Sequence, residues 1–357
     1  MRPAAGSLIG DLMIENETDC PLFRRYPQLV SSLPRMSFGS PPSPVCRLSS
    51  LEQHVRQADI WLKNDGVYGT VYGGNKVRKL EFILADAMQG RHSTLITFGG
   101  LGSHHCLATA LYGRQVGLTS SLVLVDQPIT DDVRENVRRL EESGARLHHA
   151  GSPAKAVFLA GWLALRYAQW SRPRLPYLLW PGGSTALGSL GYVNAALELA
   201  EQVRNGDLPA PRSIILALGS NGTAAGLLAG LRLAGLEARL FAVRVSNYPT
   251  VGARGVARLA NAAVKLLRAH GADAPAPDFR PRDLTVIRDC IGRGYGHPTP
   301  EAEAARALLE ECEGLRLDLT YTAKTMAALL TMIAQASISP GPVLYWHTLN
   351  ALPPQEK

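Results

Sequence analysis

The chain has 357 residues, 46% of them apolar and 19% charged, and it carries a formal net charge of +7. These values exclude wholesale disorder and suit a soluble protein of two average domains. The positive charge favours an anionic ligand. Nucleic acid is not expected as a partner, because the basic residues are mixed with acidic ones, as over 134–142, and form no basic stripe.

Cysteine usage and the N-terminal sequence bear on the compartment. Five cysteines lie at wide spacings without a CxxC pair, so neither a disulfide framework nor a metal site is expected, and the cytoplasm is the natural setting. Asp11 and Glu15 interrupt the only apolar stretch near the N-terminus, which argues against a signal peptide. The uncharged run 213–231 is broken by SNG at 220–222, which predicts a turn and not a membrane span.

Along the chain, short β-rich runs alternate with amphipathic helical segments. Residues 1–33 are predicted to form an irregular arm, PPSP at 41–44 marks a second break, and SRPRLP at 171–176 predicts a surface loop. Strand–helix alternation predicts an α/β protein with doubly wound parallel sheets. The predicted strands are 95–98, 121–125, 145–149, 176–180, 213–218, 240–245, 284–287 and 342–346, and the clearest helices are 131–143, 154–169, 192–204 and 300–313.

The string GGNKVRKLEF, at 73–82, places two glycines in a tight turn just before a helix. Lys76 would lie at the start of this helix, where the positive end of the helix dipole lowers the pKa of its amine. Schiff-base formation requires the neutral amine, so Lys76 is a candidate nucleophile. Taken alone the string is a weak indication, since a surface lysine in a turn gives the same pattern.

Two further loops follow predicted strands, where ligands bind in open α/β sheets. In TFGGLGSHHCLATA, at 97–110, Ser103 is either a helix N-cap or a hydroxyl that faces a ligand. The adjacent His104 and His105 do not face the same way, which argues against a zinc pair. In LALGSNGTAAG, at 216–226, a Gly/Ser-rich loop opens a helix, which favours a phosphate site over a plain tight turn.

Two tyrosines complete the set of candidates. Tyr295 lies in GRGYGHP and Tyr321 lies in DLTYTAK. Either tyrosine could also be an ordinary core or surface residue, so a catalytic role for each needs support from another source.

Together these strings resemble the pyridoxal 5'-phosphate (PLP)-dependent family of 1-aminocyclopropane-1-carboxylate (ACC) deaminases and D-cysteine desulfhydrases. The likeness runs from about Arg35 to Thr348, and the most specific motif, GGNKxRKLE, is intact at 73–81. The resemblance implies PLP as the cofactor and the tryptophan-synthase-β-like fold, fold type II. It also implies a Schiff base on Lys76, with Lys79 as the fallback, and it adds Asn75 to the residues that bind the cofactor.

The resemblance also implies roles for the other candidates. Ser103 would lie against the cofactor ring and relay a proton, and Tyr295 and Tyr321 match tyrosines of the family's YGxP and DPVYxGK strings. The phosphate group would be held by the loop after the strand 213–218. The residues of this loop are Gly219, Ser220, Asn221, Gly222 and Thr223.

Several positions depart from the family pattern or select a branch within it. In the family's GGxQSNH motif, Gln is replaced by Gly102 and Asn by His104, whose neutral imidazole can donate a similar hydrogen bond to the cofactor's phenolic oxygen. Thr322 and Thr348 match the desulfhydrase branch, and a threonine beside the pyridine nitrogen leaves it unprotonated, which suits β-elimination. The family's HTGG reads HTLN here, at 347–350.

The sequence thus predicts a D-cysteine desulfhydrase-like lyase or deaminase that converts a small amino acid into a 2-oxo acid and ammonia. β-Replacement, an ACC-deaminase-type reaction and a PLP-binding protein with altered catalysis remain as alternatives. A large domain is expected over 1–81 and 191–357, and a small domain over 82–190, with PLP between them. A homodimer without membrane partners is expected.

Overall fold

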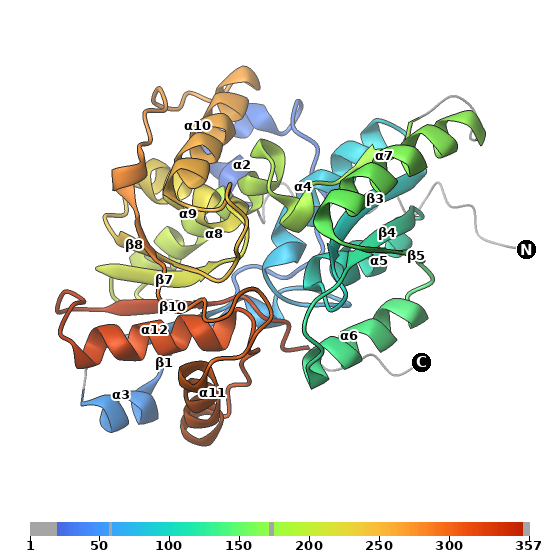
Figure 1. Cartoon of the computed structure of the whole chain (residues 1–357). Coiled ribbons are helices and arrows are strands. Elements are labelled where there is room, and N and C mark those ends of the chain that lie inside the picture. Colours follow the sequence, from blue (N-terminus) through green and yellow to red (C-terminus); the bar gives the residue numbers. More distant parts are fainter. Residues whose placement is uncertain (1–19, 57–58, 171–174, 353–357) are drawn as a thin grey trace, which may run out of the picture.

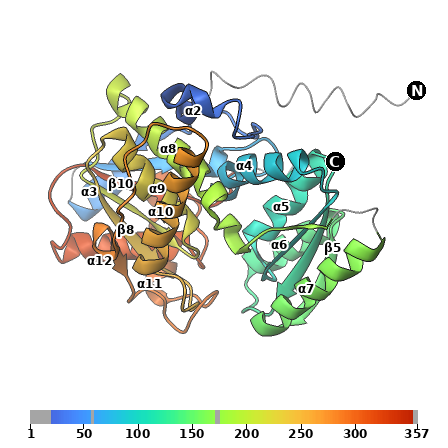
Figure 2. The ribbon, with the colours of Figure 1, turned by 90° about the horizontal axis from the view of Figure 1, so that it is seen from above.

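Two β-sheets, each with its own helices, lie side by side in the computed structural model, which describes residues 20–56, 59–170 and 175–352 (Figure 1). The six-stranded sheet has the order β1-β2-β10-β7-β8-β9, and the four-stranded sheet has the order β5-β4-β3-β6. We call the first sheet with α2, α3 and α8–α12 the large lobe, and the second with α5–α7 the small lobe. Helix α4 packs on α8 of the large lobe and on α5 of the small lobe, so it joins the two (Figure 2).

The bounds of these elements are as follows. The strands are β1 (Val45–Arg47), β2 (Ile60–Asn64), β3 (Thr94–Gly100), β4 (Thr119–Val125), β5 (Arg146–Gly151), β6 (Tyr177–Leu178), β7 (Ser213–Leu218), β8 (Arg239–Arg244), β9 (Thr285–Ile287) and β10 (Val343–His347). The α-helices are α2 (Pro21–Arg25), α3 (Ser49–Val55), α4 (Asn75–Gln89), α5 (His104–Gln115), α6 (Asp131–Glu142), α7 (Pro153–Trp170), α8 (Ala186–Asn205), α9 (Gly222–Ala234), α10 (Ala253–Ala269), α11 (Pro300–Glu313) and α12 (Thr322–Ala334). Short 3-10 turns lie at Pro27–Leu29, Asp65–Val67, Pro181–Gly183 and Pro281–Asp283.

The predicted strand–helix alternation is confirmed. Every predicted strand and the four clearest predicted helices are present, and all strand pairs are parallel except β1 with β2. The sequence analysis missed β1 and β2. Strand β2 ends in the polar residues Lys63, which is buried, and Asn64, so its hydrophobic pattern is interrupted where it pairs with β10.

Both sheets are covered by helices on their two faces, because alternate strand residues point to opposite sides. In β7, Ile214 and Leu216 pack in the same core cluster as α8, α9 and α10, whereas Ile215 packs with α3, α11 and α12. In β4, Leu122 faces the cluster that contains α4 and α5, whereas Val123 faces α7. Continuous apolar strands of this kind are typical of parallel sheets buried on both faces.

The expectation of an irregular arm over 1–33 is wrong for its described part. Residues 21–25 form α2, and Cys20, Leu22 and Leu29 are buried in the core cluster of the large lobe. The Asn194 side chain on α8 accepts hydrogen bonds from the Leu22 N–H, at 2.9 Å, and from Cys20 Sγ. The prolines in this segment suggested irregularity, but Pro21 stands in the first turn of a helix, where its missing N–H costs nothing. Residues 1–19, and 171–174 of the predicted loop, lie outside the described residues.

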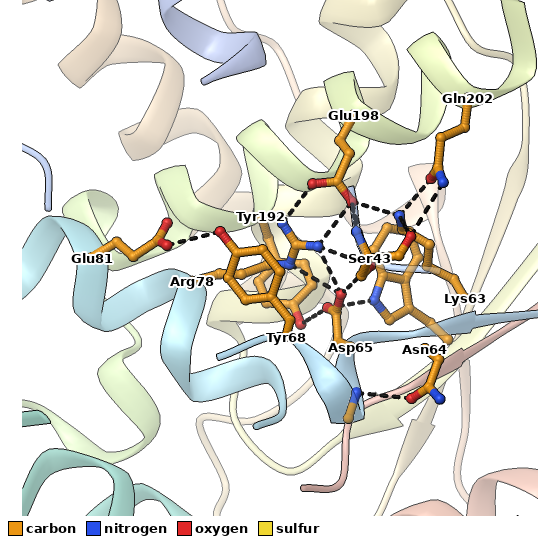
Figure 3. A network of polar contacts seen from close by, with 12 residues as sticks. Ser43, Lys63, Asn64, Asp65, Tyr68, Arg78, Glu81, Tyr192, Glu198 and Gln202 are labelled. Atoms are coloured by element: carbon orange, nitrogen blue, oxygen red, sulfur yellow. Dashed lines mark hydrogen bonds and ion pairs between the residues drawn. The ribbon is translucent and has the colours of Figure 1, made fainter. Parts of the chain in front are cut away.

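A buried network of charged side chains fixes the start of α4 against the large lobe (Figure 3). Arg78 forms ion pairs of 2.9 Å with both Asp65 and Glu198, and Lys63 lies 2.5 Å from Glu198. All four side chains are at most 2% exposed. Burial by itself would raise the pKa of Glu198, but the charges of Arg78 and Lys63 outweigh it and lower that pKa to about 2. Two cations and two anions therefore balance inside the protein.

The same network gathers neutral donors from elements that are distant in sequence. Asp65 accepts hydrogen bonds from the hydroxyls of Tyr192 and Ser43 and from the indole N–H of Trp346. Its partners thus come from α8, β10 and the segment before β1. Helix α4 is positioned by this one carboxylate and its neighbours, and Lys76 lies two residues before Arg78.

Within the described ranges, the helices all fall short of the length or apolarity that a membrane span requires.

Replacing Arg78 by leucine should lower the free energy of unfolding by about 3–5 kcal/mol, because Asp65 and Glu198 would stay buried without their main counter-charge. Arg138→Leu is the matched control, since Arg138 also pairs with two carboxylates but lies on the surface of α6. Urea denaturation of both variants measures the difference. An Arg78→Leu protein as stable as the control would show that the network does not hold α4 in place.

Candidate active site

A cavity of about 650 Å³ lies between the two lobes. It collects the loops that follow β3 and β7 and the first residues of α4, as parallel sheets predict for ligand sites. The structure brings most of the sequence-predicted site residues together in its lining. They are Asn75, Lys76, Ser103, His104, Gly219, Ser220, Asn221, Thr223, Tyr295, Tyr321 and Thr348. Two further predicted site residues, Gly222 and Thr322, are not part of this lining.

Among the residues that the structure describes, Lys76 is the only lysine in the lining of this cavity. Burial lowers the pKa of its amine to about 8, and the negative charge of Asp318 opposes the shift. Its Nζ donates to the Asn75 side-chain oxygen at 2.6 Å, and the Asn75 amide donates to the Thr223 hydroxyl at 3.1 Å. The sequence analysis attributed a lowered pKa to the helix dipole, and the structure adds burial as a cause that the sequence did not reveal.

The glycines before Lys76 pack against the segment after β10. Gly74 has a φ of +92°, and a Cβ there would lie 2.7 Å from the Thr348 carbonyl oxygen. The Asn75 N–H donates to that same oxygen at 3.2 Å, and the Gly73 N–H donates to the Asn350 side chain at 2.5 Å. The HTLN departure at 347–350 thus supplies an asparagine side chain that fastens the GGNK turn.

The loop Gly219–Thr223 runs from the end of β7 into α9, so the positive end of a 13-residue helix faces the cavity. Behind the loop lies Lys79, which is buried and donates to the Gly182 carbonyl oxygen at 2.9 Å. Among the described residues Lys79 has no carboxylate partner, and burial and the charge of Lys76 hold its pKa well below the usual range. A helix N-terminus with an unpaired buried amine beside it suits an anion.

Ser103 is the N-cap of α5, and its hydroxyl accepts a hydrogen bond from the Cys106 N–H at 3.3 Å. It also faces the cavity, so both roles weighed for it are compatible with its position. The Ser103 side chain lies so close to the backbone of β3 that residue 99 must be a glycine, because a Cβ there would lie 2.5 Å from Ser103 Oγ. Gly102, which replaces a glutamine of the family motif, packs against Val133 on α6, and a Cβ there would lie 2.8 Å from that side chain.

The two adjacent histidines point to different partners, as predicted. The His105 ring lies 3.0 Å from the Thr97 hydroxyl on β3. The His104 ring lies 2.5 Å from the Tyr72 hydroxyl and forms part of the cavity wall. Burial lowers the pKa of both rings, so both are neutral. No group of three or more His, Cys, Asp or Glu side chains among the described residues is arranged to hold a metal ion.

Tyr295 and Tyr321 form a pair, with their hydroxyl oxygens 2.5 Å apart and their rings edge to face. Burial raises the pKa of both phenols, which therefore stay protonated and can donate hydrogen bonds. The Tyr321 ring also packs on Gly219, where a Cβ would lie 2.7 Å from it. The tyrosine pair thus lies beside the loop that opens α9.

Asp318 is a buried carboxylate in the cavity lining that the sequence analysis missed. Its oxygens accept hydrogen bonds from the N–H groups of Thr320, Tyr321 and Thr322, and from the Thr322 hydroxyl at 2.7 Å. The Thr322 hydroxyl, at the start of α12, therefore donates its hydrogen bond to Asp318. The available signal is the first letter of the DLTYTAK string, from which the sequence analysis took only Tyr321 and Thr322.

Comparison with known proteins identifies the family of this chain. The sequence pattern of the family described as "pyridoxal-phosphate dependent enzyme" matches residues 36–348. The chain belongs to this family. It is 34% identical over 332 residues to a D-cysteine desulfhydrase of Klebsiella pneumoniae (strain 342), covering 91% of this chain and 96% of the relative. It is 35% identical over 335 residues to a D-cysteine desulfhydrase of Serratia proteamaculans (strain 568), with the same coverage.

A solved structure described as an ACC deaminase homologue superposes with a TM-score of 0.78 at 26% identity, over 93% of this chain and 95% of that one. The expected fold type II and the expected PLP cofactor are thereby confirmed for this pyridoxal-phosphate dependent enzyme. The cavity suits the cofactor chemically. It offers an amine of lowered pKa for the aldehyde, at Lys76, and the N-terminus of helix α9 for the phosphate.

Gly222→Val should weaken PLP binding by about 2–4 kcal/mol, the equivalent of one or two charge-assisted hydrogen bonds. A Cβ at Gly222 would lie 3.0 Å from Lys79 Nζ and 3.1 Å from the Ser184 Cα, so the loop must shift away from its anion-binding geometry. Gly161→Val on α7 is the control, because a Cβ there meets nothing within 4 Å. Titration of each apo-protein with PLP measures the affinity, and unchanged affinity in a folded Gly222→Val protein would reduce the loop to a turn.

Proposed function

We propose that this enzyme is a lyase that removes a β-substituent from a small amino acid, as the name of its D-cysteine desulfhydrase relatives describes. One observation carries the proposal. The half-buried Lys76 amine, with its pKa near 8, faces a cavity that is also lined by residues of the Gly219–Thr223 loop and by Ser103, Tyr295 and Tyr321. This set combines a covalent anchor, a phosphate cradle and proton donors in one place.

PLP, held covalently by a lysine amine, supplies an electron sink for the α-carbon of an amino acid. Lys76 is the residue proposed to hold it, because its amine is neutral in part at physiological pH. Lys79 is proposed to neutralise the phosphate together with the N–H groups at the start of α9. The structure gives Lys79 no place in the cavity lining, which favours Lys76 as the anchor.

The amino acid must lose its α-proton before the β-substituent can leave. Either Lys76 or Ser103 is proposed to accept this proton, since both residues lie in the lining. The Tyr295–Tyr321 pair, which stays protonated, is proposed to donate a hydrogen bond or proton to the leaving group. In sum, a thiol-bearing amino acid and one water molecule give hydrogen sulfide, ammonia and a 2-oxo acid.

The remaining cofactor contacts are proposed from the family resemblance and from position. Thr348 lines the cavity, and Thr322 lies directly behind Asp318, with its hydroxyl bound to that carboxylate. Two hydroxyl residues at these positions favour the desulfhydrase branch over the deaminase branch. Asn75 is proposed to orient Lys76, to which it is hydrogen bonded.

The domain boundaries remain a proposal, with 1–81 and 191–357 in a large domain and 82–190 in a small one. All four strands of the small lobe lie between 94 and 178, and the strands of the large lobe lie outside that range, which supports this division.

A homodimer is proposed from the family resemblance, and a cytoplasmic setting is proposed from the five free cysteines. Light scattering of the purified protein tests the homodimer directly.

Incubation of the PLP-loaded protein with a panel of D- and L-amino acids tests the function. Elimination releases ammonia and a 2-oxo acid in equal amounts, and a thiol substrate also releases sulfide. A new amino acid formed in the presence of an added nucleophile would instead identify β-replacement, and 2-oxobutyrate from ACC would identify the deaminase reaction. Bound PLP with no turnover of any amino acid would identify a binding protein with altered catalysis.

Lys76→Ala should abolish the covalent attachment of PLP, because Lys76 is the amine that the cavity exposes. Borohydride reduction of the wild-type protein followed by peptide mapping should place the phosphopyridoxyl group on Lys76. Lys79→Ala is the matched control, and it should keep the covalent attachment while binding PLP more weakly. A phosphopyridoxyl group on Lys79 would contradict the assignment.

Ser103→Ala should retain PLP and lose exchange of the substrate α-proton in deuterated water, if Ser103 relays that proton. As the N-cap of α5, Ser103 should also contribute about 1 kcal/mol to stability. Measuring the melting temperature together with the exchange rate separates the two effects. A lower melting temperature with normal exchange would leave Ser103 as a cap alone.

A further inference from the structure

His104 occupies the position of an asparagine in the family motif, and its ring is held by two side chains that lie outside the cavity. The Tyr72 hydroxyl lies 2.5 Å from His104 Nδ1, and Asn136 Nδ2 lies 3.4 Å from the same atom. His104 lines the cavity, whereas Tyr72 and Asn136 do not. Nδ1 is therefore directed toward the protein, on the side of Tyr72 and α6.

The partners of Asn136 fix which way these hydrogen bonds run. Asn136 Nδ2 also donates to the Gly102 carbonyl oxygen at 3.0 Å, and a carbonyl can only accept. The amide edge that faces His104 is thus its NH₂ group, which can only donate, so a hydrogen bond between the two side chains runs from Asn136 to Nδ1. A phenol is a stronger donor than acceptor and an unprotonated imidazole nitrogen is a strong acceptor, so the Tyr72 hydroxyl donates to Nδ1. A neutral imidazole that accepts at Nδ1 carries its proton on Nε2.

No hydrogen bond from the described part of the chain occupies Nε2 of His104. We propose that Tyr72 and Asn136 are positioning residues that hold His104 in the Nε2–H tautomer, so that it presents a fixed neutral donor to an anionic oxygen of the bound cofactor. The donor role rests on the proposed function, because it requires PLP in this cavity. The tautomer itself does not, since Tyr72 and Asn136 impose it without a ligand.

The need for such a partner follows from the chemistry of the substitution. An asparagine amide offers its N–H donors in a single chemical form, whereas a neutral histidine exists as two tautomers, and only one of them places N–H at Nε2. Tyr72 removes that ambiguity. Its own position is fixed by burial and by Arg139, whose guanidinium lies over the Tyr72 ring at 5.1 Å from the centroid. A histidine at this position can thus take the place of an asparagine donor because Tyr72 lies behind it.

Burial, together with nearby positive charges, keeps the His104 ring neutral. Burial is the largest cause of its lowered pKa, and Lys76 and Arg139 lower it further, whereas Asp318 and Asp132 raise it. A donor on Nδ1 adds to this effect, because protonation of that nitrogen would force the Tyr72 hydroxyl to turn and accept, which a phenol does less well. Loss of the Tyr72 hydroxyl should therefore raise the pKa of His104 and allow both neutral tautomers, since the Asn136 contact at 3.4 Å is long for a hydrogen bond.

Long-range ¹H–¹⁵N spectra of protein labelled with ¹⁵N-histidine test the proposal, with the His104 resonances assigned by their loss in His104→Asn. The wild-type apo-protein should show an unprotonated Nδ1 and a protonated Nε2, and addition of PLP should move the Nε2 resonance. Tyr72→Phe should show both tautomers and a visible PLP absorbance whose pH dependence differs from that of the wild type. Tyr177→Phe is the matched control, because its hydroxyl binds Asp86, away from the cavity.

Three results would overturn the proposal. A proton on Nδ1 in the wild-type apo-protein would contradict the tautomer, and a Tyr72→Phe spectrum like that of Tyr177→Phe would remove the role of Tyr72. An Nε2 resonance that does not move in a protein whose absorbance shows bound PLP would remove the donor role. None of these readouts needs turnover of an amino acid, so a failure of the proposed lyase activity is recognised separately by the amino-acid panel.

Discussion

The buried ion network around Arg78 is the constraint on which the rest of the site depends. Arg78, Asp65, Glu198 and Lys63 are removed from water, and such a cluster is tolerated only when its charges balance and its hydrogen bonds are complete. It ties the first turn of α4 to α8, β2 and β10. Because Lys76 stands in that same turn, the network sets where the reactive amine lies.

Each charged residue of the GGNKxRKLE string, at 73–81, has its own position in the first turns of α4. Lys76 faces the cavity, Arg78 enters the ion network, and Lys79 lies behind the loop at the start of α9. Glu81 pairs with Arg35 at 2.9 Å and accepts a hydrogen bond from the Tyr68 hydroxyl. Four charged side chains of one short segment thus have four different partners, and this explains why the string is so specific.

The departures from the family motifs are matched by neighbours elsewhere in the chain. Gly102 makes room for Val133 on α6, and Asn350 binds the backbone of the GGNK turn. His104 gains Tyr72. In each case the compensating residue lies far away in sequence or on another element, so a substitution that looks disruptive in the motif is accommodated in the folded protein. The cavity therefore keeps its amine, hydroxyls and anion loop despite these changes.

The sequence by itself determined the α/β class, most strands and the clearest helices of both lobes, the family, the cofactor and many of the residues that line the cavity. These follow from local patterns, because alternating apolar runs, glycine turns and the GGNKxRKLE string are each readable within a few residues. Only the tertiary structure decided that residues 20–33 belong to the core and that Asp318 lies in the cavity. It also showed that burial lowers the pKa of Lys76 and that Tyr72 lies against Nδ1 of His104. Burial, ion pairs and hydrogen bonds between distant segments depend on distances in space, and no local pattern in the chain encodes them.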